Sequence, residues 1–297
     1  MKLAFWTRGM PEWPVNELAA NAVALGYQGI DLRCTRPVDG RPSDGGNVSV
    51  AEPDESIDTI KHEFATAGVE LASLLCYITG GHRGTTSDWP TVEADVREHA
   101  NFARRLGAPR IRITVGHPAD GTDWDTHIAR LWSAVGSALD GSPGVSAVFE
   151  NHPGSANAEQ LLEAAVRFED PRLGVLFSPD HCVVMQEDVL DLIERYAPQI
   201  HQVCFADRRP VQEDLARFDG EYYHVRYEPC WPGEGIVPTR KILGKLADRG
   251  FEGFISLKWE KSPVFGHNLP DGETVLPYFP KWMAELGFRA SDGPALA

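Results

Sequence analysis

The sequence predicts a single-domain α/β protein folded as a closed (β/α)8 barrel, a TIM barrel. One unit recurs along the chain, an amphipathic helix, then a glycine, then an apolar strand, with the glycine at Gly26, Gly68, Gly107 and Gly250. The first three of these glycines lie roughly 40 residues apart, a period that indicates a repeated structural unit. Strand, helix and strand at this spacing form right-handed parallel crossovers. Eight such units account for most of the 297 residues.

An open doubly wound sheet is the alternative architecture. It would place a glycine-rich phosphate-binding turn, GxGxxG, directly after the first strand. The chain has the sequence WTRG at residues 6–9 instead. We therefore expect one barrel domain over residues 1–297, with the barrel at about 3–260 and a closing tail at 261–297.

The strands and helices are assigned in chain order from apolar periodicity and from the residues that end helices. Strands are expected at residues 3–6, 29–33, 69–77, 110–115, 146–152, 173–177, 200–205 and 254–259. Helices are expected at residues 15–25, 56–67, 91–106, 127–139, 158–168, 190–196, 238–249 and 276–286. Three polar segments, 37–53, 79–89 and 211–232, are expected to be loops. Long loops in a compact domain are often binding loops or lids.

Composition and charge exclude some kinds of partner. The formal net charge of −15 argues against a nucleic-acid partner, because binding to a phosphate backbone requires clustered Lys and Arg. The apolar run at residues 3–6 is interrupted at once by Thr7, Arg8 and Gly9, so we expect no signal peptide. No apolar run approaches the roughly 20 residues that span a membrane. The five cysteines show no CxxC spacing and are an odd number, which predicts reduced thiols in a cytoplasmic protein.

The segment SAVFENHPG at residues 146–154 is the main candidate for the functional site. Side chains alternate along a strand, so Glu150 and His152 share one face at its carboxyl end. Parallel α/β folds bind their ligands at this end of the strands. A carboxylate that ends an apolar strand is costly without a partner, which favours a functional role for Glu150. Support of a loop is the alternative role for His152.

Other chemically active side chains follow the remaining strands. Five residues are expected to be catalytic: Glu150, His152, His181, Lys258 and Glu260. Six residues are expected to bind substrate: Trp6, Arg33, Arg112, Asp207, Arg209 and Trp231. Carboxylates and imidazoles that converge on one barrel mouth suit either a divalent metal or a general acid/base pair. Structural roles are the alternative, for example an ion pair between Asp207 and Arg208 or a rigid turn around Trp231.

Five stretches of the chain resemble a known family. They are VFENHPG at 148–154, PGEG at 232–235, and the segments 173–181, 203–209 and 254–260. Together they resemble the xylose isomerase-like TIM barrel superfamily, in particular its sugar phosphate isomerase/epimerase group, over residues 3–286. That group includes hydroxypyruvate isomerases, ketose 3-epimerases, inosose dehydratases and dehydroshikimate dehydratases. The resemblance therefore implies an enzyme of carbohydrate metabolism.

The resemblance also implies a divalent metal, Mn²⁺, Mg²⁺ or a similar ion. In the family it is held by Glu, Asp, His and Glu at the ends of the fifth to eighth strands. Glu150 matches the first of these positions. The other three positions fall on Ser178, Cys204 and Lys258, which depart from the pattern.

Two explanations of this departure compete. In the first, the site is rebuilt and Mn, Mg, Co or Zn is held in shifted geometry by Glu150, Asp180, His181 and Cys204, or by Glu260. In the second, Lys258 replaces the charge of the metal and stabilises an enolate, so that the enzyme is metal-independent. An ammonium at a metal position would repel a cation, and the second explanation accounts for this substitution more directly.

These features predict an isomerase or epimerase that acts on a small sugar-like hydroxy-carbonyl compound through an enolate or enediolate. Glu150 is the expected base, and His152 or His181 is the expected proton partner. A lyase, either a dehydratase or a keto-glycoside-cleaving enzyme, is one alternative because it shares the enolate. A catalytically degenerate barrel that binds a sugar or serves as a partner subunit is another. We expect no nucleic acid and no membrane as partner, and the resemblance implies a homo-oligomer.

Overall fold

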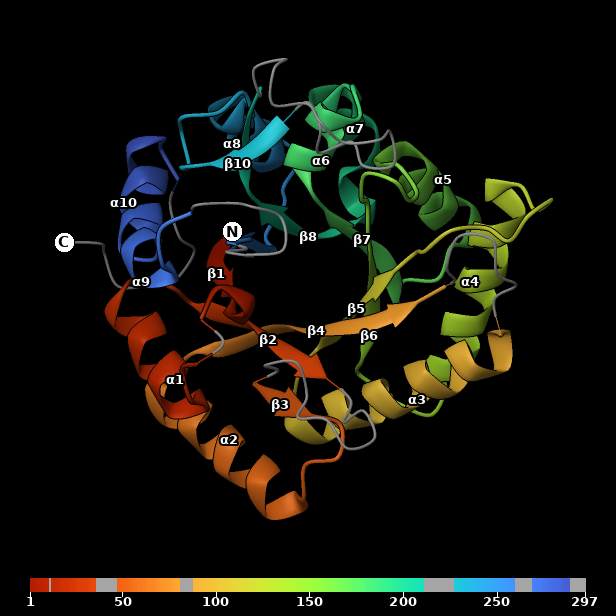
Figure 1. Cartoon of the computed structure of the whole chain (residues 1–297), viewed down its shortest axis with the longest axis horizontal. Coiled ribbons are helices and arrows are strands. Elements are labelled where there is room, and N and C mark those ends of the chain that lie inside the picture. The colour runs from red at the N-terminus through yellow and green to blue at the C-terminus, as the bar shows by residue number, and fades with distance from the viewer. Residues whose placement is uncertain (11, 36–46, 81–87, 211–226, 260–268, 289–297) are drawn as a thin grey trace.

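The computed structural model describes residues 1–10, 12–35, 47–80, 88–210, 227–259 and 269–288. Its central sheet is a closed barrel of parallel strands: β1 (Lys2–Trp6), β2 (Gly29–Thr35), β4 (Glu70–Thr79), β5 (Arg110–Thr114), β6 (Ser146–Glu150), β7 (Leu173–Phe177), β8 (Ile200–Phe205) and β11 (Phe254–Leu257). β1 pairs with both β2 and β11, which closes the sheet on itself. The predicted (β/α)8 barrel is confirmed, and Figure 1 shows its helices arranged around the strands.

The helices cover the outer face of the barrel. They are α1 (Val15–Ala24), α2 (Asp54–Ala67), α3 (Trp89–Leu106), α4 (Trp124–Leu139), α5 (Ala158–Phe168), α7 (Val189–Tyr196), α8 (Thr239–Asp248), α9 (Gly272–Val275) and α10 (Tyr278–Glu285). The recurring glycines end several of them: Gly68 and Gly107 follow α2 and α3 with φ of 74° and 86°, a conformation that glycine adopts without a steric penalty. Within the described residues, no helix combines the length and apolarity needed to cross a membrane.

Two helix predictions differ from the structure for local reasons. α4 begins at Trp124, three residues before the predicted start, because the carboxylate of Asp123 accepts a hydrogen bond from the backbone N–H of Thr126 at 2.7 Å and caps the helix. The helix predicted at 276–286 is α10, which begins at Tyr278. A short helix that the sequence did not predict, α9, precedes it and ends at Val275, and Pro277 between them has no N–H to continue α9. α10 packs on the barrel, with the Phe279 ring 5.7 Å from the ring of Phe205.

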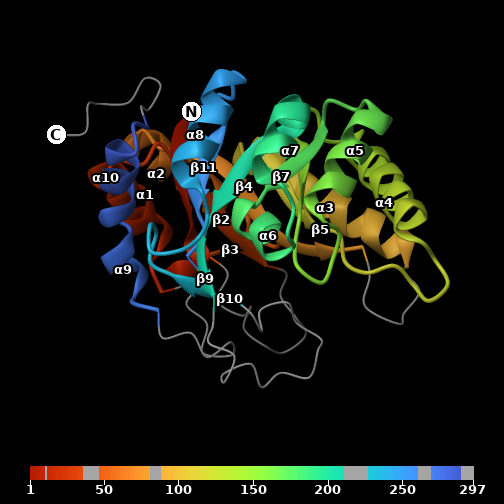
Figure 2. The same ribbon diagram turned by 90° about the horizontal axis from the view of Figure 1, so that it is seen from above.

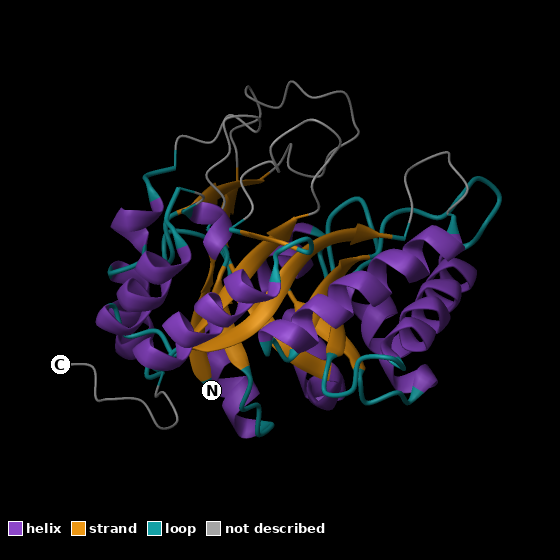
Figure 3. Ribbon diagram, turned by 90° about the horizontal axis from the view of Figure 1, so that it is seen from below, coloured by secondary structure: helices purple, strands orange, loops and turns teal. Residues whose placement is uncertain are grey.

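The three segments predicted as loops lie partly outside the described residues. Their described parts contain two strands that the sequence did not predict. β3 (Val48–Ser49) pairs with the end of β2, and β10 (Tyr227–Cys230) pairs antiparallel with β9 (Asp207–Pro210). Figure 2 shows that the arm formed by β9 and β10 lies at the opposite end of the barrel from the N-terminus. This is the end at which the parallel strands finish. Figure 3, seen from the other side, shows the barrel strands enclosed by the helices.

Alternate residues of each barrel strand face two different environments. Phe149 points outward and stacks on Trp132 of α4, with ring centres 3.6 Å apart. Val148 points inward, where it forms a small buried cluster with Trp6, Leu75, Leu176 and Cys204. Since Glu150 follows Val148 by two residues, its side chain also points into the barrel, as the alternation predicts.

The first turn of α5 offers a test of local stability. The side chain of Asn157 accepts a hydrogen bond from the N–H of Gln160 at 2.8 Å, while the Gln160 side chain accepts one from the N–H of Asn157 at 3.0 Å. Asn157→Ala removes half of this capping box, so we expect a loss of about 1 kcal/mol in the free energy of unfolding. Urea denaturation measures it, with exposed Ser133→Ala in α4 as the control. Equal midpoints for the two variants would contradict the capping role.

Candidate active site

The carboxylate of Glu150 is the centre of a buried charge cluster at the end of β6. Arg112, on neighbouring β5, donates to Oε2 of Glu150 through Nε at 2.7 Å and through Nη2. Lys258, directly after β11, donates to Oε1 at 2.7 Å. The Ser178 hydroxyl and the Cys204 thiol donate to the same oxygen at 3.3 and 3.8 Å. Glu150 is 0% exposed, so its charge depends on these partners for compensation.

Lys258 connects Glu150 to His181. Its Nζ lies 3.1 Å from Nε2 of His181 and 5.2 Å from the ring centre of Trp6. An ammonium has only donors, so Nε2 of His181 is the acceptor of this hydrogen bond. The positive charge of Lys258 is therefore held by a carboxylate, an imidazole lone pair and the face of an aromatic ring.

His181 is positioned by α6 (Pro179–Val184), a short helix that the sequence analysis did not predict. Pro179 stands at the first position of this helix, where proline is well tolerated. Nδ1 of His181 donates to the backbone oxygen of Asn151 at 2.7 Å, which leaves the lone pair on Nε2. The Asn151 side chain also connects the end of β6 to the start of α6. It accepts a hydrogen bond from the N–H of Ser178 at 2.8 Å and donates one to the carbonyl of Ser178 at 3.1 Å.

The charges of the cluster decide which groups are ionised. Burial acts to raise the pKa of Glu150, but Arg112 and Lys258 outweigh it and hold this pKa well below its usual range. Burial and the Lys258 ammonium hold the pKa of His181 well below its usual value, and they also lower the pKa of His152. At neutral pH, Glu150 is ionised and both imidazoles are neutral. A carboxylate with a depressed pKa is a weak base, so the geometry favours Glu150 as a counter-ion.

Three of the residues expected to bind substrate lie at this cluster. Arg112 has its guanidinium 5.4 Å from the ring centre of Trp6 and 5.8 Å from that of Tyr77. Arg33 covers the Tyr77 ring at 5.2 Å. Trp6 is buried, and its indole Nε1 has no hydrogen-bond partner among the described residues.

Asp207 lies in the β9–β10 arm, and its carboxylate is occupied by the backbone. It accepts hydrogen bonds of 2.9 to 3.2 Å from the N–H groups of Arg208, Gly233, Gly235 and Val237. This favours a structural role for Asp207 in the turn that follows β10. The alternative of an ion pair between Asp207 and Arg208 is wrong, because the guanidinium of Arg208 donates to Asp180 at 2.9 Å.

The other two candidates of the arm make contacts of their own. Arg209 is exposed and pairs with Glu228 across the hairpin at 2.6 Å. Trp231 packs 4.8 Å from the ring of Tyr278 and 5.9 Å from that of Trp259. Neither contact reaches the Glu150 cluster. The remaining catalytic candidate, Glu260, lies outside the described residues.

The arrangement around Glu150 does not fit a divalent metal. The ammonium of Lys258 stands within hydrogen-bond distance of both Glu150 and His181, two of the four expected ligands. Asp180 is paired with Arg208, and the Cys204 thiol has its pKa raised by burial and by Glu150. A metal ion would need deprotonated ligands and would repel the ammonium. The cluster therefore already contains a positive charge where the family resemblance implies a cation.

Two residues of this site were missed by sequence reasoning: Asn151 had no assigned role, and Arg208 was considered only as a partner of Asp207. Asn151 was part of the ENHPG segment, and its position beside Glu150 was the available signal. Arg208 pairs with Asp180 across 28 positions of sequence, and no local pattern indicates such a contact.

The fold and the site together define an α/β barrel whose polar groups gather at the carboxyl ends of its strands. A family model described as the xylose isomerase-like TIM barrel matches residues 19–286. The chain belongs to this family.

Curated relatives and solved structures agree with this assignment. Inosose dehydratase of Lacticaseibacillus casei is 24% identical over 199 residues, which are 61% of this chain and 67% of the relative. The match thus spans about two thirds of the relative's length. The crystal structure of the IOLI protein with a bound zinc atom has a TM-score of 0.70 at 14% identity, over 97% of this chain and 98% of that one.

D-psicose 3-epimerase, crystallised in the presence of D-fructose, is similarly related. The match has a TM-score of 0.70 at 12% identity and covers 96% of this chain and 99% of the epimerase chain. At such identities the solved structures establish the fold alone. Inosose dehydratase and D-psicose 3-epimerase are both named as enzymes.

Proposed function

We propose that this chain is an isomerase or epimerase that moves a proton at the carbon next to the carbonyl group of a small sugar-like compound. The observation that carries the proposal is the position of Lys258, 2.7 Å from Glu150 and 3.1 Å from His181. A fixed ammonium of this kind stabilises the negative charge that develops on an enolate oxygen. It supplies the charge that a metal supplies elsewhere in the family.

His152 is the proposed base. Its Nδ1 lies 2.8 Å from the carbonyl oxygen of Pro153, which can only accept, so Nδ1 carries the proton and Nε2 the lone pair. Its ring lies edge-on to the ring of His181, with centres 4.6 Å apart. Burial and Lys258 lower the pKa of His152, which keeps the imidazole neutral and able to accept a proton.

The reaction then removes a proton from one carbon and returns a proton to carbon. Nε2 of His152 takes the proton from the carbon next to the carbonyl, and the electron pair moves to the carbonyl oxygen, where the Lys258 ammonium stabilises it. Return of the proton to the former carbonyl carbon, together with transfer of the neighbouring hydroxyl proton to the enolate oxygen, gives the isomer. Protonation of the first carbon on its opposite face, by a second donor on that face while His152 keeps the first proton, gives the epimer. Glu150 holds Lys258 in place and remains ionised throughout.

A lyase is the second candidate function. The similarity to inosose dehydratase supports it, at 24% identity over 199 residues. The same enolate would expel a hydroxyl or a glycosidic group from the neighbouring carbon, after protonation of the leaving oxygen. Product mass separates the two functions, since loss of water or of an aglycone indicates the lyase and an unchanged mass the isomerase.

A cytoplasmic location and a homo-oligomeric state remain predictions of the sequence.

Deuterium incorporation tests the shared first step. The protein is incubated in D₂O with ketohexoses, a ketoinositol and small hydroxy-keto acids, and the carbon next to each carbonyl is followed by NMR. We expect exchange into at least one of these compounds. Exchange absent from every compound would support the non-catalytic barrel instead.

Chelation tests the role assigned to Lys258. After dialysis against EDTA, we expect the exchange rate per folded protein to stay within about twofold of the rate before dialysis. The reason is that the cation which stabilises the oxyanion is the Lys258 side chain, which dialysis does not remove. Circular dichroism of the same sample controls for unfolding. A rate that disappears on dialysis and returns with added Mn²⁺, Mg²⁺ or Co²⁺ would show that a metal is required.

A further inference from the structure

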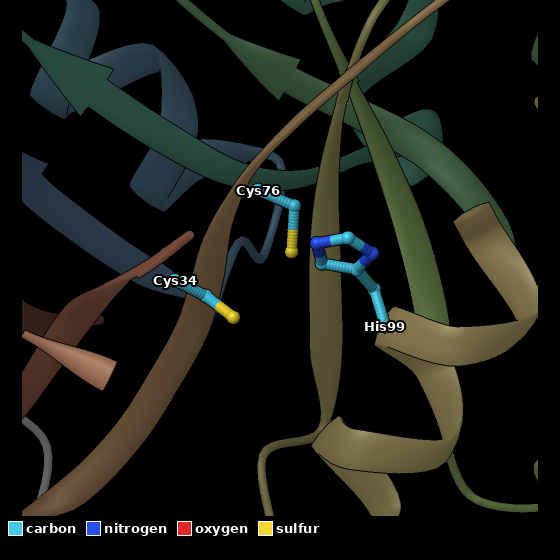
Figure 4. Close-up of side chains that lie close together, drawn as sticks. All are labelled: Cys34, Cys76 and His99. Atoms are coloured by element: carbon cyan, nitrogen blue, oxygen red, sulfur yellow. The ribbon is translucent and has the colours of Figure 1, made fainter. Parts of the chain in front are cut away.

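A second group of ligand-type side chains lies outside the barrel, between its wall and α3. Cys34 of β2, Cys76 of β4 and His99 of α3 are all buried, and each offers a ligand atom within 4.8 Å of the other two. Arg33 and Leu75 are register partners in the β2–β4 ladder, so the two cysteines that follow them are neighbours on adjacent strands. Figure 4 shows the three side chains directed toward one another.

The imidazole of His99 presents a lone pair to the thiols. Its Nδ1 lies 2.8 Å from the backbone oxygen of Asp95, one turn earlier in α3. A carbonyl only accepts, so Nδ1 carries the proton and Nε2 has the lone pair. In Figure 4 the nitrogen farther from the helix, Nε2, points toward the sulfur of Cys76. A ring fixed through its other nitrogen by a backbone carbonyl is the usual arrangement of a histidine that binds a metal.

The chemistry of these ligands selects the kind of ion. Thiolates and imidazole bind Zn²⁺ and Cu⁺ in preference to Mg²⁺, Ca²⁺ or Mn²⁺. In zinc sites the Zn–S distance is about 2.3 Å and the Zn–N distance about 2.0 Å, so ligand atoms on one ion lie roughly 3.5–4 Å apart. Small side-chain shifts bring the three atoms here, which lie within 4.8 Å, to that spacing. With both thiols deprotonated, Zn²⁺ gives a neutral site and Cu⁺ a negative one, and a buried apolar layer favours the neutral site.

We propose that Cys34, Cys76 and His99 bind one Zn²⁺ ion that fastens α3 to strands β2 and β4. Binding releases one proton from each thiol, and a water molecule completes the tetrahedral coordination. The site shares no ligand residue with the Glu150 cluster, and Arg112 of that cluster donates to the backbone oxygen of Cys76 at 3.3 Å. Its residues point away from the barrel interior, in the same apolar layer that contains Leu32 and Leu74.

Cobalt substitution tests the proposal directly. The full chain is purified without a metal-affinity tag, stripped with a strong chelator in the presence of a phosphine reductant, and titrated with Co²⁺ and then Zn²⁺. We expect one equivalent of Co²⁺ to produce a near-ultraviolet sulfur-to-cobalt band and visible bands of a tetrahedral ion. Zn²⁺ should abolish these bands and raise the melting temperature. Absence of the sulfur-to-cobalt band in the folded protein would overturn the proposal.

Variants locate the ion. Cys34→Ser and Cys76→Ser should each weaken Zn²⁺ binding by more than about 100-fold, because even loss of a supporting contact to a ligand costs 10- to 100-fold. Cys230→Ser, at a buried cysteine of β10, is the matched control and should bind like the wild type. Glu150→Gln should also retain the ion. Loss of binding in Glu150→Gln but not in Cys34→Ser would place the metal in the barrel mouth and refute the site.

Two other outcomes also contradict the proposal, the first by its effect on the site and the second by its effect on the choice of metal. A Cys34–Cys76 disulfide in protein purified without reductant, with no zinc present, would indicate a redox pair. Tighter retention of Cu⁺ than of Zn²⁺ in competition with a Cu⁺ chelator and a zinc indicator would overturn the choice of Zn²⁺.

Discussion

Lys258→Ala is expected to lower kcat/KM by about 10²- to 10³-fold, the usual effect of removing one group that stabilises an oxyanion. The ammonium is the one cation of the cluster that contacts both Glu150 and His181 in the described structure. Without the ammonium, Glu150 is still paired with Arg112. The negative charge that develops on the enolate oxygen then has no cation at the position of Lys258. The effect should appear mainly in kcat, because the interaction forms as the transition state develops.

Two controls separate charge from packing in this experiment. Lys245→Ala removes a lysine that is partly exposed and pairs with Glu194 at 2.7 Å, and it should leave the rate unchanged. Lys258→Met keeps the length of the side chain without its charge and should be as slow as Lys258→Ala. The rates are measured by deuterium exchange on the same substrate. A Lys258→Met variant that keeps more than half of the wild-type rate would refute the role given to the ammonium.

Glu150→Ala is expected to lower the free energy of unfolding by about 3–5 kcal/mol, since it leaves buried cations without their partner. The Arg112 and Lys258 side chains are only 8% and 3% exposed, so water compensates neither of them well. Glu194→Ala is the matched surface control. Glu194 is 48% exposed and pairs with Lys245, and exposed pairs contribute at most about 1 kcal/mol. Urea denaturation of both variants at pH 7 gives the comparison, and equal losses would contradict the buried counter-ion.

The difference in the free energy of unfolding between the wild type and Glu150→Ala should depend on pH with a definite sign. The pKa of Glu150 in the folded chain lies well below its usual range, so the unfolded chain binds the proton more readily. The stabilisation is complete above the unfolded pKa of about 4.3 and is lost as the pH falls toward the folded pKa. The gap in stability between the wild type and Glu150→Ala should therefore narrow below pH of about 4. A gap that widens with acid would show that Glu150 is protonated in the folded chain.

The predicted fold and part of the predicted site followed from local signals. The glycines after α2 and α3 are the residues that a left-handed helix end requires, and their regular spacing indicated the barrel. The alternation of side chains in β6 placed Glu150 and Val148 on the inner face. These features depend on residues within a few positions of one another, so they can be predicted from local patterns in the sequence.

The tertiary structure decided which of the candidate residues act together. Glu150 and Lys258 are 108 positions apart, and their contact exists because the closed barrel brings β6 and β11 to the same interior. The structure likewise placed the Asp207 carboxylate on four backbone N–H groups, away from the cluster. It also brought His99 to Cys34 and Cys76. Contacts of this kind depend on how distant strands and helices pack, and no periodicity or spacing within one segment encodes them.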